Sequence, residues 1–258
     1  LEAKNEKGRT ALMCAAENGH VETTQYLVKA SAELEAKDEN GGTALMCAAQ
    51  EGHLETAQFL VTAGAELEAK DEDVKTALML AAENGHVAVA QYLVKAGAEV
   101  NAKNEDGYTA LMWAVYEGHA AMAQFLVTAG AELEAKDEEG MTALMIAAQN
   151  GHLETAKCLV TAGAELNAKD EEGMTALMWA AREGRLETVQ FLVTAGANVN
   201  AKSNNGSTAL MVAAEKGHVE TAQCLVTAGA ELEATEEEGW TALMWAAQNG
   251  HIETAQCL

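Results

Sequence analysis

Histidine is the residue type in this chain that most readily indicates chemistry, because imidazole ligates metals and transfers protons near neutral pH. The seven histidines occupy one position of a 33-residue repeat, and Arg185 takes that position in the sixth repeat; they are His20, His53, His86, His119, His152, His218 and His251. The ligands of one zinc ion lie within about 2.0–2.1 Å of it, and residues spaced by whole repeats cannot converge on one ion at that distance. We therefore expect the histidines to close turns between helices, and we expect no metal and no other cofactor.

Paired carboxylates are the second candidate for chemistry, at Glu138 with Glu139, at Glu171 with Glu172, and at 236–238. A general acid needs a pKa raised by burial or crowding, whereas these acids fall in polar turn segments that water reaches. The calcium-loop pattern, a glycine-rich phosphate loop, a Gly-x-Ser-x-Gly turn and a readable Cys/His dyad are missing. The sequence predicts a protein that is not an enzyme.

The five cysteines fall into two repeated positions. Cys14 and Cys47 are equivalent in adjacent repeats, and so are Cys224 and Cys257, with Cys158 in the second position two repeats earlier. Equivalent residues on stacked helices lie roughly 8–10 Å apart, beyond the reach of a disulfide. We interpret them as small buried hydrophobic residues in a reducing, intracellular compartment, the cytoplasm above all.

The elements that must position all these residues are set by one tetrapeptide. Thr-Ala-Leu-Met occurs at 10–13 and returns every 33 residues, without insertion, at Thr43, Thr76, Thr109, Thr142, Thr175, Thr208 and Thr241. So strict a period indicates identical supersecondary units that bury their apolar faces by stacking. We predict an all-α repeat solenoid in one array over 1–258, with repeats 1 to 8 at 1–40, 41–73, 74–106, 107–139, 140–172, 173–205, 206–238 and, incomplete, 239–258.

Repeat 2 shows the expected local structure. Thr43 suits the N-cap of a short apolar helix over 44–50, because its hydroxyl can accept a hydrogen bond from an early helical N–H. A second helix is expected over 54–63, with Gly64 as its C-terminal cap. The residues that follow read as an extended turn leading to the next repeat.

Three runs recur in register along the whole chain: Thr-Ala-Leu-Met-x-Ala-Ala-x-x-Gly-His, Leu-Val-x-Ala-Gly-Ala and Asn/Glu-Ala-Lys-Asp-x-x-Gly. On these residues the chain resembles ankyrin-repeat proteins. The resemblance implies helix-turn-helix units joined by hairpin turns, stacked into a curved array. It also implies a concave groove, lined by the first helices and hairpin tips, that binds other proteins.

The chain departs from the family pattern in three places. The family usually has Thr-Pro-Leu-His where this chain has Thr-Ala-Leu-Met, so we expect methionine to fill the histidine's space by packing alone. Ser31 replaces the capping glycine in repeat 1, and Val74 replaces the hairpin glycine in repeat 3. Both positions favour glycine if the backbone is left-handed there.

Charge limits the classes of partner. Forty acidic residues against 16 basic ones give a formal net charge of −24, which repels nucleic-acid phosphates and anionic lipids. We expect no nucleic-acid partner. The acidity serves either solubility or attraction of a basic partner. Without a long apolar run or a visible signal peptide, the chain is expected to be soluble and not inserted in a membrane.

Information on partners can lie only where the repeats differ. The residue after the hairpin glycine is apolar in four repeats, as Tyr108, Met141, Met174 and Trp240. Polar residues are favoured at exposed tips, so we predict that these four form an apolar contact stripe along the groove. The residue after Leu-Met is Trp113, Trp179 or Trp245 in three repeats, which serves either packing between first helices or groove contact. Tyr116 lies just before Glu117, where contact with a partner in the groove is the favoured role.

Two further sets of residues are candidates. Arg182 and Arg185 share a helical face before a turn without acids, so this window is predicted to receive an acidic segment, with pairing to Glu183 and Glu187 as the alternative. Six repeats begin the second helix with Glu-Thr, whereas repeats 3 and 4 have Ala-Val and Ala-Met there. Val89 and Met122 are therefore predicted to form an outer patch, unless the change is drift between duplicated repeats.

The sequence thus favours a non-catalytic scaffold that binds a protein partner through the groove and hairpin tips. The alternative is an architectural subunit held within a larger complex through its outer face and ends. Neither end shows a polar capping repeat, which favours a longer array or end faces docked on other subunits. A small-molecule enzyme is the third and least favoured class.

Overall fold

The computed structural model describes residues 1–258 and consists of eight helix pairs without β-strands. It divides into two compact units, residues 1–132 and 133–258, which are described separately. Unit 1 contains α1 Ala11–Glu17, α2 Val21–Lys29, α3 Ala44–Gln50, α4 Leu54–Thr62, α5 Ala77–Glu83, α6 Val87–Ala96, α7 Ala110–Tyr116 and α8 Ala120–Thr128. Unit 2 contains α9 Ala143–Asn150, α10 Leu153–Thr161, α11 Ala176–Arg182, α12 Leu186–Thr194, α13 Ala209–Lys216, α14 Val219–Thr227, α15 Ala242–Gln248 and α16 Ile252–Cys257.

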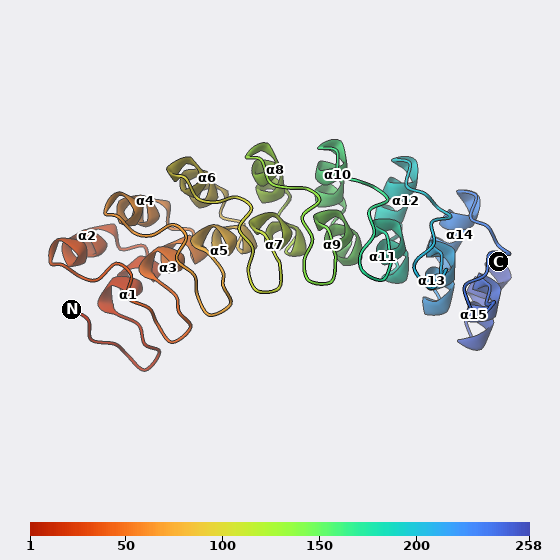
Figure 1. The fold of residues 1–258 in the computed structure, drawn as a ribbon, viewed down its shortest axis with the longest axis horizontal. Helices are drawn as coiled ribbons and strands as arrows, with labels where there is room; N and C mark the ends of the chain where they lie inside the picture. The colour runs from red at the N-terminus through yellow and green to blue at the C-terminus, as the bar shows by residue number, and fades with distance from the viewer. The chain divides into compact units, whose positions relative to one another are not determined.

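The helices of each unit form two layers (Figure 1). In unit 1 the first helices α1, α3, α5 and α7 pack on one another in order, as do the second helices α2, α4, α6 and α8. Unit 2 repeats this arrangement, and each first helix also packs on its own second helix. The predicted helical repeat stack is confirmed. Its core consists of the Leu and Met of each Thr-Ala-Leu-Met run and the alanines that follow, which are buried from Leu12 to Met211.

The expected helix cap is present in repeat 2. The Oγ1 atom of Thr43 accepts a hydrogen bond from the backbone N–H of Met46 at 3.4 Å, and the first helix spans the residues expected for it. The second helix ends at Thr62, one residue earlier than expected, because Gly64 turns the chain with a φ of 101°.

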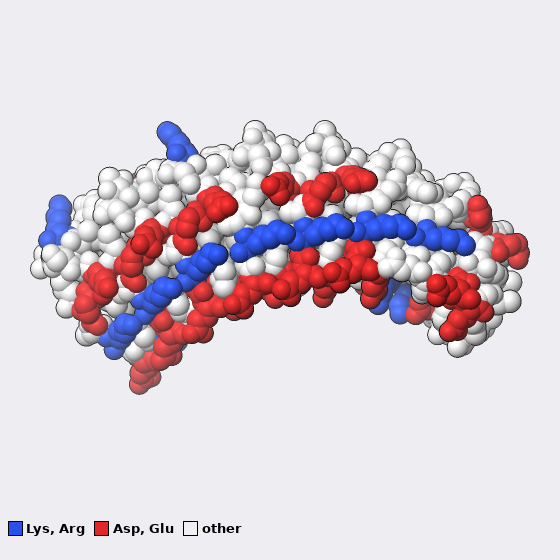
Figure 2. All heavy atoms as spheres, viewed as in Figure 1, with Lys and Arg blue, Asp and Glu red and all other residues white.

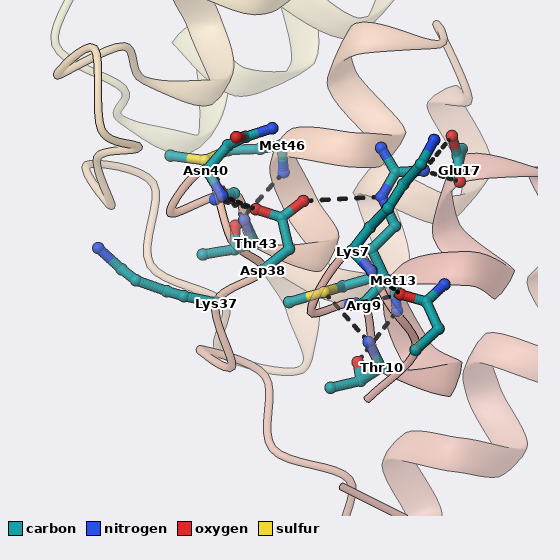
Figure 3. Close-up of polar contacts among 12 residues, drawn as sticks. Lys7, Arg9, Thr10, Met13, Glu17, Lys37, Asp38, Asn40, Thr43 and Met46 are labelled. Atoms are coloured by element: carbon teal, nitrogen blue, oxygen red, sulfur yellow. Dashed lines mark hydrogen bonds and ion pairs between the residues drawn. The ribbon is translucent and has the colours of Figure 1, made fainter. Parts of the chain in front are cut away.

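The methionine of this motif also accepts a hydrogen bond through its sulfur atom. The backbone N–H of Thr10 donates to the sulfur of Met13 at 3.4 Å, and Thr43 donates to Met46 at the same distance (Figure 3). Thr142 and Met145 form the same pair in unit 2. The expectation that methionine acts by packing alone is therefore wrong. A sulfur atom is a weak acceptor, but it occupies the place where an N–H would otherwise be buried without one.

Two residues other than glycine adopt a left-handed backbone, as expected. Ser31 has a φ of 66° and Val74 a φ of 59°, whereas the glycine equivalent to Val74 in the preceding repeat, Gly41, has a φ of 76°. The backbone therefore keeps the conformation that the repeat requires, and a β-branched side chain is strained at that position.

The histidines link neighbouring repeats. His53 Nε2 lies 2.9 Å from the carbonyl oxygen of Glu17, and because a carbonyl can only accept, the imidazole must donate. Equivalent bonds join His86 to the carbonyl of Gln50 and His119 to that of Glu83. A Cβ atom at Gly19 would lie 2.6 Å from the His53 ring, so glycine leaves the space that the ring fills. This geometry explains the repeated Gly-His pair by structure.

Lysines and carboxylates also connect the hairpins. Lys37 Nζ donates to the carbonyl of Lys70 at 2.7 Å, and Lys169 Nζ donates to that of Lys202 at 2.6 Å. Within each unit these lysines form a row between acidic side chains (Figure 2). Some of the acids bond backbone as well, since Glu35 accepts from the N–H of Glu66 at 2.8 Å. Part of the acidic composition therefore has a structural role that the sequence analysis did not anticipate.

Candidate functional site

The candidate residues that the structure brings together lie where each hairpin meets the first helix of its repeat. We call this surface the hairpin face of each unit. In unit 1 it includes Tyr108, Trp113 and Tyr116, and in unit 2 it includes Trp179, Arg182, Trp240 and Trp245. All four tryptophans of the chain lie on the hairpin face.

Three aromatic rings form a cluster on α7 and the hairpin before it. The ring centroids of Tyr108 and Trp113 are 5.1 Å apart, and those of Trp113 and Tyr116 are 6.2 Å apart in an edge-on arrangement. Both separations suit the offset and edge contacts that aromatic rings prefer. Trp113 is half-buried, whereas 46% of Tyr116 is exposed. The cluster therefore combines a packed base with an accessible edge. This arrangement is compatible with both roles considered for Trp113, packing between first helices and contact in the groove.

A cation from the preceding repeat covers this cluster. Lys75 Nζ lies 3.9 Å from the centroid of the Trp113 ring and 3.0 Å from a carboxylate oxygen of Glu83. The indole Nε1 of Trp113 is buried and has no hydrogen-bond partner. Because the lysine side chain is only 13% exposed, its contacts with the ring and carboxylate are partly shielded from water.

The Lys75–Glu83 ion pair has a counterpart in repeat 1. Arg9, in the same position as Lys75, binds both carboxylate oxygens of Glu17 at 2.6 Å (Figure 3). Arg9 Nε also lies 3.6 Å from Asp38 Oδ2. These ion pairs were not predicted, although the sequence carries a signal for them: a cation followed eight residues later by Glu.

In unit 2 a buried carboxylate holds the tryptophan of α11. Asp170 is 8% exposed, and its Oδ2 accepts from Trp179 Nε1 at 2.8 Å, while its Oδ1 accepts from the N–H of Met174 at 2.8 Å. The Arg182 guanidinium lies 5.1 Å from the centroid of the Trp179 ring. Arg182 forms no ion pair with Glu183 or Glu187, so the alternative of pairing within the chain is wrong. The guanidinium contacts the Trp179 ring instead.

The last aromatic pair lies on α15 and its hairpin. The ring centroids of Trp240 and Trp245 are 5.0 Å apart, and both side chains are partly exposed. The N–H of Trp240 donates to Glu236 Oε1 at 2.9 Å, which fixes the hairpin against the helix. Unlike Trp113 and Trp179, Trp245 has no Lys or Arg side chain over its ring.

The predicted exposure of Met141 and Met174 is wrong. They are 4% and 6% exposed, so the apolar stripe contains only Tyr108 and Trp240 of the four residues expected. The N–H of Met141 donates to Asp137 Oδ1 at 2.8 Å, and Met174 donates equally to Asp170. This turn draws the residue back against the first helix, where a flexible apolar side chain folds away from water.

The predicted outer patch is also wrong, because Val89 is 1% exposed and Met122 is 0% exposed. In the Glu-Thr pair of repeats 2 and 5 to 8 only the Glu faces water, while the Thr, as at Thr56, is buried; in repeat 1 Thr23 is exposed. Val89 and Met122 align with the buried Thr. The exposed positions in these two repeats are Ala88 and Ala121, which offer little apolar surface.

The cysteines are free thiols and are only partly buried, which corrects the expectation that they are buried residues. Burial nevertheless raises the pKa of the Cys47 thiol to about 12. Burial also raises the thiol pKa of Cys158, Cys224 and Cys257. A raised pKa keeps the thiol neutral, which disfavours a nucleophilic role.

Comparison with known families agrees with this architecture. The family model described as ankyrin repeats (3 copies) matches residues 1–71, 63–137, 130–203 and 196–258. No curated protein matches the chain. None of the helices has the length and apolar character needed to cross a lipid bilayer.

Proposed function

Because the chain belongs to the ankyrin-repeat family, whose repeats act as protein-interaction modules, we propose that it is a non-catalytic scaffold whose protein partner binds to the hairpin face. The observation that carries this proposal is the aromatic cluster of Tyr108, Trp113 and Tyr116 in unit 1. Partly exposed aromatic residues dominate the binding energy of many protein interfaces, because they bury a large area at a small cost in conformational entropy.

The surroundings of the cluster support a protein partner over a small molecule. Tyr116 is partly exposed, while Lys75, which is paired with Glu83, lies over the Trp113 ring. A rigid aromatic base with an accessible edge and charged neighbours resembles the core and rim of a protein interface.

The alternative, an architectural subunit held through its outer face and ends, loses the two outer-face residues on which it partly rested. Val89 and Met122 lie in the core and can contact a partner only if the repeat opens. Most exposed large hydrophobic residues off the hairpin face are at the two ends of the chain or on α2. The hairpin face is therefore the surface that we assign to the partner.

Site-specific photo-crosslinking tests this assignment with two exposed tyrosines. Tyr116 lies on the hairpin face and Tyr26, which is 69% exposed, lies on the second helix α2. A benzophenone amino acid at position 116 should give a discrete adduct in native extract, and one at position 26 should not. As unlabelled competitors, Tyr26→Ser should suppress the adduct as well as the wild type does, and Tyr116→Ser should suppress it poorly. An adduct only at position 26, or equal competition by both variants, contradicts the proposal.

A further inference from the structure

One site of the hairpin face occurs twice in the chain, with two of its four residues changed. Lys75, Glu83 and Trp113 in repeats 3 and 4 correspond to Ser207, Glu215 and Trp245 four repeats later. The fourth member of the site, Tyr108, corresponds to Trp240. Each copy lies within a single unit. The second copy therefore keeps the carboxylate and two rings but lacks the cation.

The backbone frames of the two copies match. In the first copy His119 Nε2 bonds the carbonyl of Glu83 at 3.0 Å, and in the second His251 Nε2 bonds the carbonyl of Glu215 at 2.9 Å. The ring pairs match as well, with centroids 5.1 Å apart for Tyr108 and Trp113 and 5.0 Å apart for Trp240 and Trp245. The first copy can therefore be used to infer what the second one binds.

In the first copy the chain supplies its own ligand. The Lys75 ammonium lies 3.9 Å from the Trp113 centroid and donates to both carboxylate oxygens of Glu83, at 3.2 and 3.0 Å. Such a position combines a cation–π contact with charge-assisted hydrogen bonds. An alkylammonium group is therefore the ligand that this combination of groups holds.

In the second copy the chain places no cation at the equivalent position. Ser207 is too short to reach the Trp245 ring, and no Lys or Arg side chain lies over that ring. Ser207 and Glu215 also border a hollow of about 570 Å³, together with residues of repeat 6 such as Met174, but Trp240 and Trp245 do not line it. Glu215 pairs only with Lys216, at 3.0 Å, and both side chains are more than a third exposed, so this ion pair is easily exchanged. Arg182 borders the same hollow, but its guanidinium lies over Trp179.

We infer that the site formed by Ser207, Glu215, Trp240 and Trp245 binds the ammonium group of a lysine side chain on the protein partner. This inference rests on the proposed function, because it assigns the partner's chemistry at the same hairpin face. The bound lysine takes the place that Lys75 occupies in the first copy, over the Trp245 ring and against the Glu215 carboxylate. Glu236 and its neighbours Glu237 and Glu238 add negative charge beside the rings.

Binding of short peptides to the whole chain tests this inference without the natural partner. The probes are capped Gly-Gly-Lys-Gly-Gly and its matched peptides with norleucine or arginine in place of lysine. The indole N–H signals of Trp240 and Trp245 in NMR spectra report occupancy. We expect the lysine peptide to shift them saturably and to bind about tenfold or more tightly than the norleucine peptide, the effect of losing the cation. Equal shifts by norleucine, or stronger binding of arginine, would overturn the assignment to lysine.

Two reciprocal variants use the chain's own repeats as controls. Ser207→Lys copies repeat 3 and should abolish the response of Trp240 and Trp245, because the new side chain fills the site. Lys75→Ser copies repeat 7 and should create a lysine-dependent response at Trp113. If Ser207→Lys disturbs folding, Glu215→Gln serves instead and should weaken binding about tenfold, with Glu187→Gln on α12 as the matched loss of one distant charge. Unchanged binding in Ser207→Lys or Glu215→Gln overturns the inference.

The peptide experiment and the crosslinking experiment test separate claims, so a negative result in one can be distinguished from a negative result in the other. Loss of the lysine response with a persistent adduct at position 116 rejects lysine recognition alone. A lysine response that follows the variants, combined with an adduct only at position 26, rejects the hairpin face as the main partner surface and leaves the ammonium site intact.

Discussion

The backbone N–H of Thr43 donates to the sulfur of Met46 across 3.4 Å, inside the motif that repeats along the chain. Met46→Leu keeps most of the buried volume but removes the acceptor, so the Thr43 N–H loses its partner. We expect a loss of about 1 kcal/mol in the free energy of unfolding. Met112→Leu is the matched control, because Met112 is fully buried in the same position of repeat 4 without such a sulfur contact. Urea denaturation measures both, and equal losses contradict a role for the sulfur.

The strained backbone of repeat 3 gives a second prediction. Val74 has a φ of 59°, where a β-branched residue is unfavourable. Val74→Gly should raise the free energy of unfolding by about 1 kcal/mol, the relief of strain exceeding the entropy that glycine gains in the unfolded chain. The reverse change at the equivalent position of the preceding repeat, Gly41→Val, should destabilise by more, because a Cβ there meets the backbone of Glu72 at 2.9 Å. A less stable Val74→Gly variant would show that the valine side chain contributes packing that outweighs its strain.

The buried threonines of the second helices provide a third prediction. Thr56 Oγ1 is buried without a partner, whereas Thr24 Oγ1 donates to the carbonyl of His20 at 2.9 Å. Thr56→Val removes a buried unpaired hydroxyl and should raise the free energy of unfolding by about 1 kcal/mol. Val89, in the equivalent position of repeat 3, shows that the helix pair accommodates valine.

The comparison variant for this test is Thr24→Val, which removes a satisfied hydroxyl. We expect it to be neutral or destabilising in the same urea experiment. If both substitutions stabilise equally, the gain comes from hydrophobicity alone and not from the unpaired hydroxyl.

The reactivity of Cys47 follows from its surroundings. Burial raises the thiol pKa from 9.0 to about 12. At pH 8, below both values, the thiolate fraction is about a thousandfold smaller than in an unperturbed thiol. Mass spectrometry of the peptide carrying Cys47 should show slow alkylation in the native protein and fast alkylation in urea. Equal alkylation rates in the native and unfolded protein would exclude the raised pKa of Cys47.

The same shift gives a sign for the pH dependence of stability. A group whose pKa is raised on folding contributes stability that is complete below its unfolded pKa and is lost as pH rises through the folded value. The contribution of Cys47 should therefore decline from about pH 9 towards pH 12. A Cys47→Ala variant should lack this part of the alkaline decline.

The period of the sequence was sufficient to predict the fold, because each repeat contains its own cap, helix and turn signals. The strict spacing of Thr43 and Gly64 placed the helix ends within one residue. Local chemistry of this kind depends on near neighbours in the chain, which the sequence displays directly.

Exposure was harder to predict, because it depends on which of two adjacent residues faces the next repeat. The Glu-Thr pair suggests exposure of both residues, whereas from repeat 2 onward its Thr is buried, as at Thr56, and the predicted exposure of Val89 and Met122 is wrong for that reason. The predicted exposure of Met141 and Met174 is wrong for a different reason, because an aspartate side chain bends the hairpin back over the helix. The partner-binding role of Tyr116 and the tryptophans stays a prediction.

Because all four tryptophans lie on the hairpin face, their indole signals report directly whether the protein partner binds there. A partner isolated by crosslinking is titrated into isotope-labelled protein, and the indole N–H signals in NMR spectra are followed together with the ring signals of Tyr26. Partner binding at the hairpin face predicts that the indole signals shift or broaden while those of Tyr26 remain in place. Saturable binding that shifts the ring signals of Tyr26 and leaves all four indole signals unchanged would contradict partner binding at the hairpin face.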